Sequence, residues 1–114
     1  MVKRWQVEAE TKHAELLAQY TEVEISELPE LDALDEKTGE GCAVYFVLDG
    51  DEIVYVGSSS FIADRLNYWI RDKRFGRKRW TRICVLPVDE CVRFTVENHY
   101  IRLLEPRDNI EWVA

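Results

Sequence analysis

One acidic residue near the C-terminus lies where a helix would place it against a protein core. Residues 89–104 are predicted to be helical, beginning at Asp89 and ending before Pro106. At 100° per residue, Glu97 falls inside the apolar arc formed by Val92, Phe94, Val96, Tyr100, Ile101, Leu103 and Leu104. A carboxylate that faces a core is costly unless it is paired or bound to a cation. Two interpretations therefore stay open for Glu97: a salt bridge to an arginine of another helix, or a ligand for a divalent metal ion such as Mg²⁺.

A dense run of positive charge is the second feature that could do chemistry. Residues 65–82 contain a single acid, Asp72, and eight basic residues: Arg65, Arg71, Lys73, Arg74, Arg77, Lys78, Arg79 and Arg82. Such a run could follow the phosphate backbone of a nucleic acid. It could equally be the solvated surface of a helix and a loop, and charge alone does not decide between them.

The remaining charge is distributed unevenly along the chain. The net charge is −7, and residues 1–40 hold eleven acidic residues against four basic ones, whereas residues 41–114 hold eleven of each. Residues 1–40 are therefore expected to form an acidic helical extension and lead-in, and residues 41–114 a separate domain. The acidic segment could lie against the basic run and compete with a nucleic acid, or it could be a lead-in that gives solubility and touches nothing basic. It could also be a surface for a protein partner.

Composition places the chain in the class of small soluble globular proteins. It has 114 residues, of which 46% are hydrophobic, so one packed domain is expected. The longest apolar run, residues 43–48, is too short to span a bilayer. Three cysteines, an odd number without a C-x-x-C pair, fit a reducing compartment, and we expect a cytoplasmic protein.

The elements that must position these residues follow from periodicity and from turn residues. An amphipathic helix is predicted over 5–20, with His13 at the edge of its apolar stripe. Strands are predicted over 43–49, 52–57 and 81–86, and helices over 60–72 and 89–104. This order predicts an α+β fold, in which a three-stranded, mainly antiparallel sheet is flanked by helices.

Several of these residues together resemble a known family. Ala43-Val44-Tyr45, followed after nine residues by Tyr55-Val56-Gly57, resembles the paired motif that names the GIY-YIG nuclease superfamily. Arg65 follows Gly57 by eight residues, as in the family, and residues 97–109 resemble its E-x3-I-x4-P-x2-N segment. The resemblance covers roughly residues 41–110. It extends to the N-terminal nuclease domain of the bacterial excision-repair incision protein and to phage and mobile-element endonucleases.

The resemblance implies a fold and a reaction. Relatives hydrolyse DNA phosphodiester bonds with one divalent metal ion, so DNA is the expected partner and Mg²⁺ or Mn²⁺ the expected cofactor. By resemblance, Glu97 would bind the metal ion, Arg65 would hold the scissile phosphate, and Tyr45 would activate or orient the attacking water. Tyr55 would form hydrogen bonds within the site.

Two further residues would shape the site by the same resemblance, namely Gly57, where the backbone would turn tightly, and Asn109, which would support the site. The basic residues expected to bind nucleic acid are Arg71, Lys73, Arg74, Arg77, Lys78 and Arg79. Strand geometry is compatible with the paired motif. Tyr45 and Tyr55 can share one face of a regular hairpin if its loop has an odd number of residues, and Asp49-Gly50-Asp51 provides three.

The chain also departs from the family pattern. Ala43 replaces the first glycine, Ser58 stands where several relatives carry lysine, and Trp69 stands where many carry histidine or tyrosine. These departures support an alternative function, a catalytically weakened relative that binds nucleic acid or protein without cutting. The sequence predicts neither the DNA target, nor the pathway, nor the oligomeric state.

Overall fold

The computed structural model describes residues 4–30, 41–62, 64–65 and 81–109, and it describes the side chains of helix α1 (Arg4–Thr21) from residue 12 onward. The greater part of the predicted helix over 60–72, namely residues 63 and 66–72, lies outside these residues. The same is true of Trp69 and of the six basic residues expected to bind nucleic acid, from Arg71 to Arg79.

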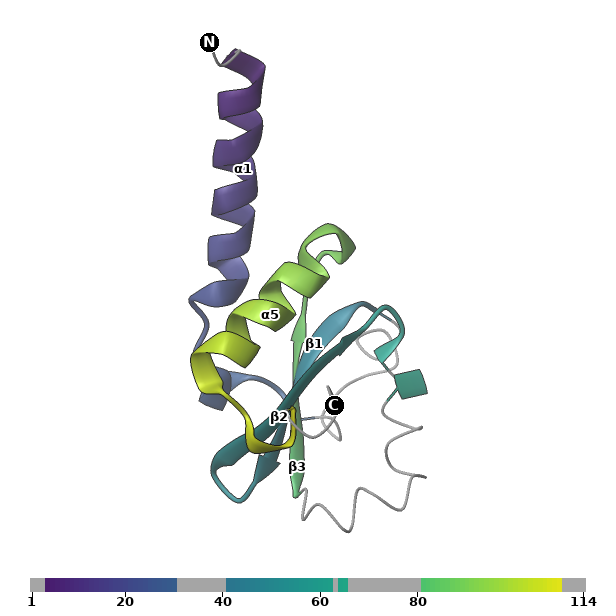
Figure 1. The fold of residues 1–114 in the computed structure, drawn as a ribbon. Coiled ribbons are helices and arrows are strands. Elements are labelled where there is room, and N and C mark those ends of the chain that lie inside the picture. Colours follow the sequence, from purple (N-terminus) through teal and green to yellow (C-terminus); the bar gives the residue numbers. More distant parts are fainter. Residues whose placement is uncertain (1–3, 31–40, 63, 66–80, 110–114) are drawn as a thin grey trace.

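Three antiparallel strands form the centre of the protein (Figure 1). They are β1 (Ala43–Asp49), β2 (Glu52–Ser59) and β3 (Arg82–Pro87), and they lie in the order β2-β1-β3. The middle strand β1 is buried from residue 43 to residue 48, as expected for a continuously apolar strand that is covered on both faces. The predicted three-stranded antiparallel sheet flanked by helices is confirmed.

The hairpin between β1 and β2 differs from the prediction. Asp49 pairs with Glu52, so the turn has two residues, Gly50 and Asp51, and Gly50 adopts a φ of 64°. A two-residue turn alone would place the two tyrosines on opposite faces. The pairing shifts by one residue between Val47 and Leu48, and this β-bulge brings Tyr45 and Tyr55 back to the same face.

One face of the sheet is covered by helices. Asp89 accepts a hydrogen bond from the amide of Cys91 and so caps a short 3-10 helix, η3 (Glu90–Val92), which leads into α5 (Arg93–Leu104). Buried side chains of η3 and α5 pack on β1, and among them the ring of Tyr100 meets that of Phe46 edge-on at 5.0 Å between centroids.

Helix α1 packs on the same cluster through its C-terminal part, while its N-terminal end projects away from the sheet (Figure 1). The helix predicted over 5–20 is therefore confirmed, but His13 is exposed instead of lying at a core edge. Two members of the predicted apolar arc of α5 are also exposed, Phe94 at 62% and Leu103 at 64%. The part of the helix surface that packs on the protein core is narrower than the arc of apolar residues.

The described part of the acidic lead-in is attached to the sheet. Leu28 packs against the core, the Pro29 carbonyl accepts a hydrogen bond from the amide of Val85, and Glu30 forms an isolated bridge with Cys84. The lead-in thus covers the free edge of β3, which would otherwise expose unpaired backbone groups. Within the part of the chain that the structure describes, no helix is long and apolar enough to cross a membrane.

Candidate active site

A cavity of about 410 Å³ lies at the edge of the sheet formed by β2. Its lining comes from β1, β2, the segment after β2 and the start of α5, and consists of Tyr45, Tyr55, Gly57, Ser58, Arg65, Arg93, Phe94 and Glu97. Neighbouring residues of a strand point to opposite faces of the sheet. Gly57 and Ser58 therefore line this cavity from opposite faces of β2. Four predicted site residues, Tyr45, Tyr55, Arg65 and Glu97, therefore meet in one place.

Gly57 has a different structural role from the predicted one. It lies inside β2, which continues to Ser59, and it pairs directly with Tyr45 across the hairpin. A Cβ atom on Gly57 would lie 2.4 Å from the Tyr45 hydroxyl oxygen and 2.5 Å from Cζ. The tight turn expected at Gly57 is thus wrong, and the missing side chain instead leaves room for the ring of Tyr45.

The two tyrosine rings lie close together, with centroids 6.1 Å apart. Burial raises the pKa of the Tyr55 phenol above its usual value of 10.0, and the negative charge of Glu97 acts in the same direction. A hydrogen bond with Tyr45 and the charge of Arg65 oppose this shift without cancelling it. Tyr55 is therefore protonated at neutral pH and can donate a hydrogen bond.

Glu97 is half-buried and reaches the cavity from α5. Its Oε2 accepts a hydrogen bond from the Ser58 hydroxyl at 2.8 Å. Among the described residues it forms no ion pair, so the salt-bridge interpretation of this carboxylate finds no partner there. Its position at a cavity, and not in the core, explains how a charged group is tolerated on this arc of the helix.

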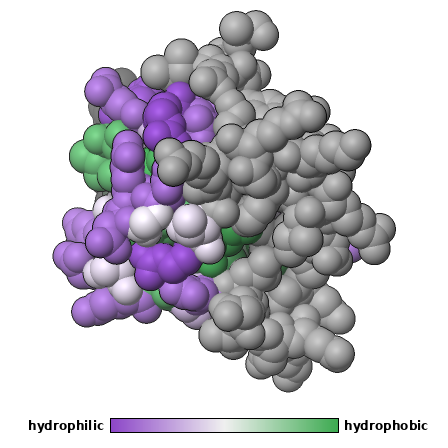
Figure 2. Space-filling model, turned by 90° about the horizontal axis from the view of Figure 1, so that it is seen from below, coloured by the Kyte–Doolittle hydropathy of each residue, from purple (hydrophilic) through white to green (hydrophobic). Residues whose placement is uncertain are grey.

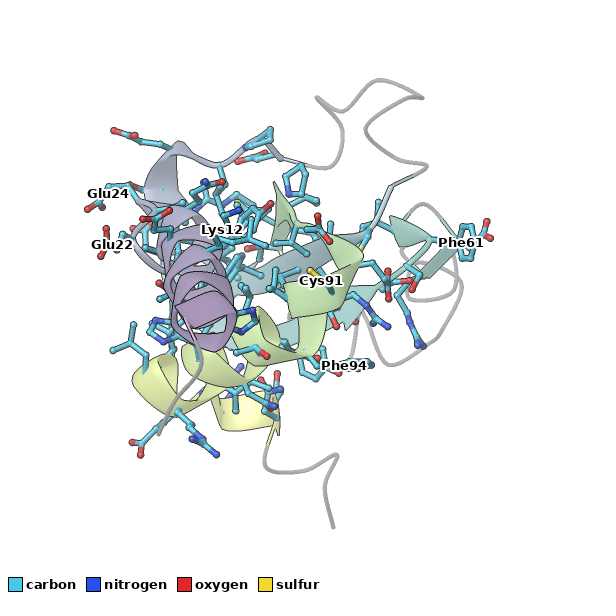
Figure 3. All side chains as sticks on the ribbon, turned by 90° about the horizontal axis from the view of Figure 1, so that it is seen from above. Lys12, Glu22, Glu24, Phe61, Cys91 and Phe94 are labelled. Carbon is cyan, nitrogen blue, oxygen red and sulfur yellow. The ribbon has the colours of Figure 1, made fainter. Side chains whose placement is uncertain are left out.

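Arg65 is exposed at the cavity and also lines a second hollow of about 290 Å³ with Ser59, Phe61 and Asp64. The exposed ring of Phe61 projects from the protein on the side away from α1 (Figure 3). The arginine is thus exposed to solvent at both hollows. Seen from below, the described surface is largely hydrophilic (Figure 2).

Asn109 supports the cavity from behind. Its side chain is buried, its Oδ1 accepts from the amide of Val56 at 2.8 Å, and its Nδ2 donates to the carbonyl of Val56 at 2.8 Å. The amide thereby pairs with the outer edge of β2 next to Gly57, as a neighbouring strand would. The tight turn that follows Pro106 holds Asn109 at this edge.

Solved structures of one nuclease domain have a similar fold. The chain superposes on the GIY-YIG N-terminal endonuclease domain of UvrC from Thermotoga maritima bound to magnesium, with a TM-score of 0.56 and 20% identity, covering 65% of this chain and 97% of that one. Two point mutants of the same domain, each bound to its catalytic divalent cation, superpose with TM-scores of 0.55. One carries phenylalanine for tyrosine (20% identity) and the other alanine for asparagine (19% identity), and both matches cover 65% of this chain and 96% of theirs.

The chain has the GIY-YIG fold. No protein-family model and no curated protein matches the sequence. The chain thus resembles the UvrC domain in three-dimensional structure. At about 20% sequence identity, this resemblance establishes the fold alone.

The cavity of this GIY-YIG fold suits a divalent cation held by one carboxylate. No group of three His, Cys, Asp or Glu side chains that could hold a metal ion exists among the described residues. Glu97 is the carboxylate that lines the cavity, and one of its oxygens is fixed by Ser58. Mg²⁺ is commonly held by one or two carboxylates together with water and substrate phosphate, and a cavity of this size has room for both.

Two cavity residues were missed by the sequence analysis. Arg93 was not considered, and Phe94 was assigned to the apolar face that packs on the core, yet both line the cavity. A signal for Arg93 was available, because it precedes Glu97 by four residues and therefore lies on the same face of the helix. No comparable signal separates Phe94 from the apolar residues of the same helix.

Proposed function

We propose that the protein is a divalent-metal-dependent nuclease that hydrolyses DNA phosphodiester bonds, with Mg²⁺ or Mn²⁺ held by Glu97. The observation that carries this proposal is the meeting of Tyr45, Tyr55, Arg65 and Glu97 in one open cavity. The likeness to an endonuclease domain that binds magnesium supports it.

Each group at the cavity would have its own task in hydrolysis. A bound divalent ion would supply positive charge next to the scissile phosphate and the leaving oxygen. The exposed guanidinium of Arg65 can bind a phosphate oxygen and offset the charge that develops during the reaction. Tyr45 is buried and held over Gly57, so it has a fixed position from which to orient or deprotonate a water molecule.

Tyr55 takes the complementary role. Because its pKa is raised by burial, it keeps its proton and can donate a hydrogen bond to a phosphate oxygen. In this proposal Tyr45 orients or deprotonates the water, and Tyr55 donates a hydrogen bond. Asn109 holds the backbone of β2 on which Tyr55 and Gly57 are placed.

The proposal is tested by incubating the purified protein with supercoiled plasmid and with branched DNA, in Mg²⁺ and in EDTA. We expect nicking or cleavage in Mg²⁺ and none in EDTA. Cleavage of branched DNA alone would define the substrate as a structure and not as a base sequence. DNA that stays intact in Mg²⁺ and in Mn²⁺, with a folded protein, would contradict the proposal.

A second function is favoured by one observation. Ser58 stands where several relatives carry lysine, and its hydroxyl is bonded to Glu97. In this alternative the site binds DNA without cutting it. The same experiment separates the two, because a binding module would shift DNA in a gel without producing nicks.

A further inference from the structure

The side chain of Arg93 is fixed at the cavity by contacts on two sides. Its Nε donates to Oε1 of Glu90 at 3.0 Å, and its Nη1 donates to the Ser58 hydroxyl oxygen at 3.1 Å. Its guanidinium carbon also lies 4.1 Å from the centre of the Phe94 ring. The side chain is only 13% exposed, although Arg93 stands in the first turn of a helix at the protein surface.

Ser58 connects Arg93 to Glu97. A hydroxyl has one hydrogen, and the Ser58 oxygen already accepts from Arg93, so its own hydrogen is directed to Oε2 of Glu97 at 2.8 Å. The positive charge of Arg93 thus lies two hydrogen bonds from the carboxylate without forming an ion pair with it. This arrangement keeps a cation beside Glu97 without a direct ion pair between the two side chains.

The ion pair with Glu90 does not by itself account for this placement. Glu90 is 55% exposed and lies three residues before Arg93 in the chain, and an ion pair with an exposed partner at this spacing contributes little to stability. These hydrogen bonds to Glu90 and Ser58 use two of the five N–H donors of the guanidinium. The group therefore retains donors in a cavity that also holds Arg65 and Glu97.

We propose that Arg93 is a second phosphate-binding residue of this site, contacting a phosphate oxygen of the DNA backbone on the side of the cavity opposite the tyrosines. The inference rests on the proposed function in that it takes DNA as the ligand. Arg65 and Arg93 then hold the backbone from two directions, one from the segment after β2 and one from α5. Planar guanidinium groups suit this task because they form two parallel hydrogen bonds with a phosphate.

The test measures binding of a short DNA duplex in EDTA, where no cleavage occurs, over a range of salt concentrations. Loss of one phosphate contact makes the slope of log affinity against log salt concentration less steep by about 0.9. We expect this change, with weaker binding at low salt, for Arg93→Gln but not for Arg93→Lys. Arg102→Gln is the matched control, because Arg102 is an exposed arginine of the same helix that does not line the cavity.

A second comparison removes the carboxylate that competes with phosphate for Arg93. Glu90→Gln should tighten DNA binding more than Glu105→Gln, which removes an exposed carboxylate next to the other end of α5. This comparison decides the matter even if Arg93→Gln fails to fold. Equal effects of Glu90→Gln and Glu105→Gln would overturn the proposal, as would a salt slope of folded Arg93→Gln that matches that of Arg102→Gln.

The outcomes also separate this inference from the nuclease itself. If the wild-type protein cleaves in Mg²⁺ and the salt slope of Arg93→Gln is unchanged, the phosphate contact of Arg93 is contradicted and the nuclease proposal is supported. If the wild-type protein never cleaves and the salt dependence of DNA binding is less steep for Arg93→Gln, the nuclease proposal is contradicted and the phosphate contact of Arg93 is supported.

Discussion

Gly57 determines whether Tyr45 can lie in the cavity. Because a Cβ atom at this position would meet the Tyr45 hydroxyl at 2.4 Å and Cζ at 2.5 Å, Gly57→Ala should displace the ring. Overpacking of this kind costs about 1–3 kcal/mol of stability. We expect the variant to lose most of its DNA cleavage, measured as plasmid nicking at a temperature where the fold is intact by circular dichroism.

Gly50→Ala provides the matched control. Gly50 has a positive φ of 64°, so alanine is strained there, but no atom lies within 4 Å of the added methyl group. This variant should lose stability and keep its activity. Equal losses of activity in both variants would show that general destabilisation, and not the position of Tyr45, explains the effect of Gly57→Ala.

At the scale of elements, the turn after α5 is joined to β2 by the two hydrogen bonds between Asn109 and the backbone of Val56. Asn109→Ala would leave both backbone groups without their partner, at a cost of about 1–3 kcal/mol. We expect a lower midpoint of chemical denaturation and faster hydrogen exchange of the Val56 amide. Unchanged exchange at Val56 would show that water or another group replaces the side chain.

The sequence predicted the elements well because each has a local signal. The apolar run of β1, the β-branched residues of β2 and the cap at Asp89 depend on nearby residues only. The hairpin shows where prediction from local signals ends. Tyr45 and Tyr55 were correctly predicted to share a face, but the turn that was predicted to cause this was wrong. A three-residue loop was predicted, whereas a two-residue turn and a bulge produce the same facing.

The candidate site was predictable to a similar extent. Glu97 could be singled out because a charge on an apolar arc breaks the helical pattern. Arg93 and Ser58 break no pattern, since an arginine in a first helical turn and a serine after a strand are usually solvated. The hydrogen bonds that Ser58 forms with Glu97 and with Arg93 depend on how α5 packs on β2, which is a property of tertiary structure.

At the scale of the whole molecule, several groups keep their protons in the folded state. Burial, assisted by Glu90, raises the pKa of the Cys42 thiol from 9.0 to about 12, and burial also raises the pKa of Cys84, Tyr55 and Tyr100. In the unfolded chain these groups ionise at their ordinary values of 9.0 and 10.0. Above pH 9 the unfolded state therefore binds fewer protons than the folded state.

The stability of the protein should consequently decline as the pH rises above 9. The part due to Cys42 is fully present below pH 9 and is lost as the pH approaches 12. Urea denaturation at a series of pH values would measure the decline, and Cys42→Ser, which does not titrate, should show a shallower one. An identical pH dependence in this variant would contradict the assignment to Cys42.

The acidic lead-in and the basic run touch at one described pair, Glu30 and Arg82, whose charged atoms lie 3.2 Å apart. Both side chains are more than 40% exposed, so this pair contributes little to stability. The idea that the acidic segment competes with DNA for the basic run stays a prediction. So does the division of the chain at residue 40, although the lead-in is attached to the sheet through residues 28–30.

The most direct test of the whole account is Mg²⁺-dependent nicking of supercoiled plasmid by the wild-type protein and by Glu97→Gln, side by side. The amide of glutamine still accepts the hydrogen bond from Ser58, so the variant should fold normally, but it lacks the charge that would hold a divalent cation. We predict nicking by the wild-type protein and, for the variant, the level seen in EDTA. Nicking by Glu97→Gln at the wild-type rate would contradict the assignment of Glu97 as the metal ligand and with it the proposed mechanism.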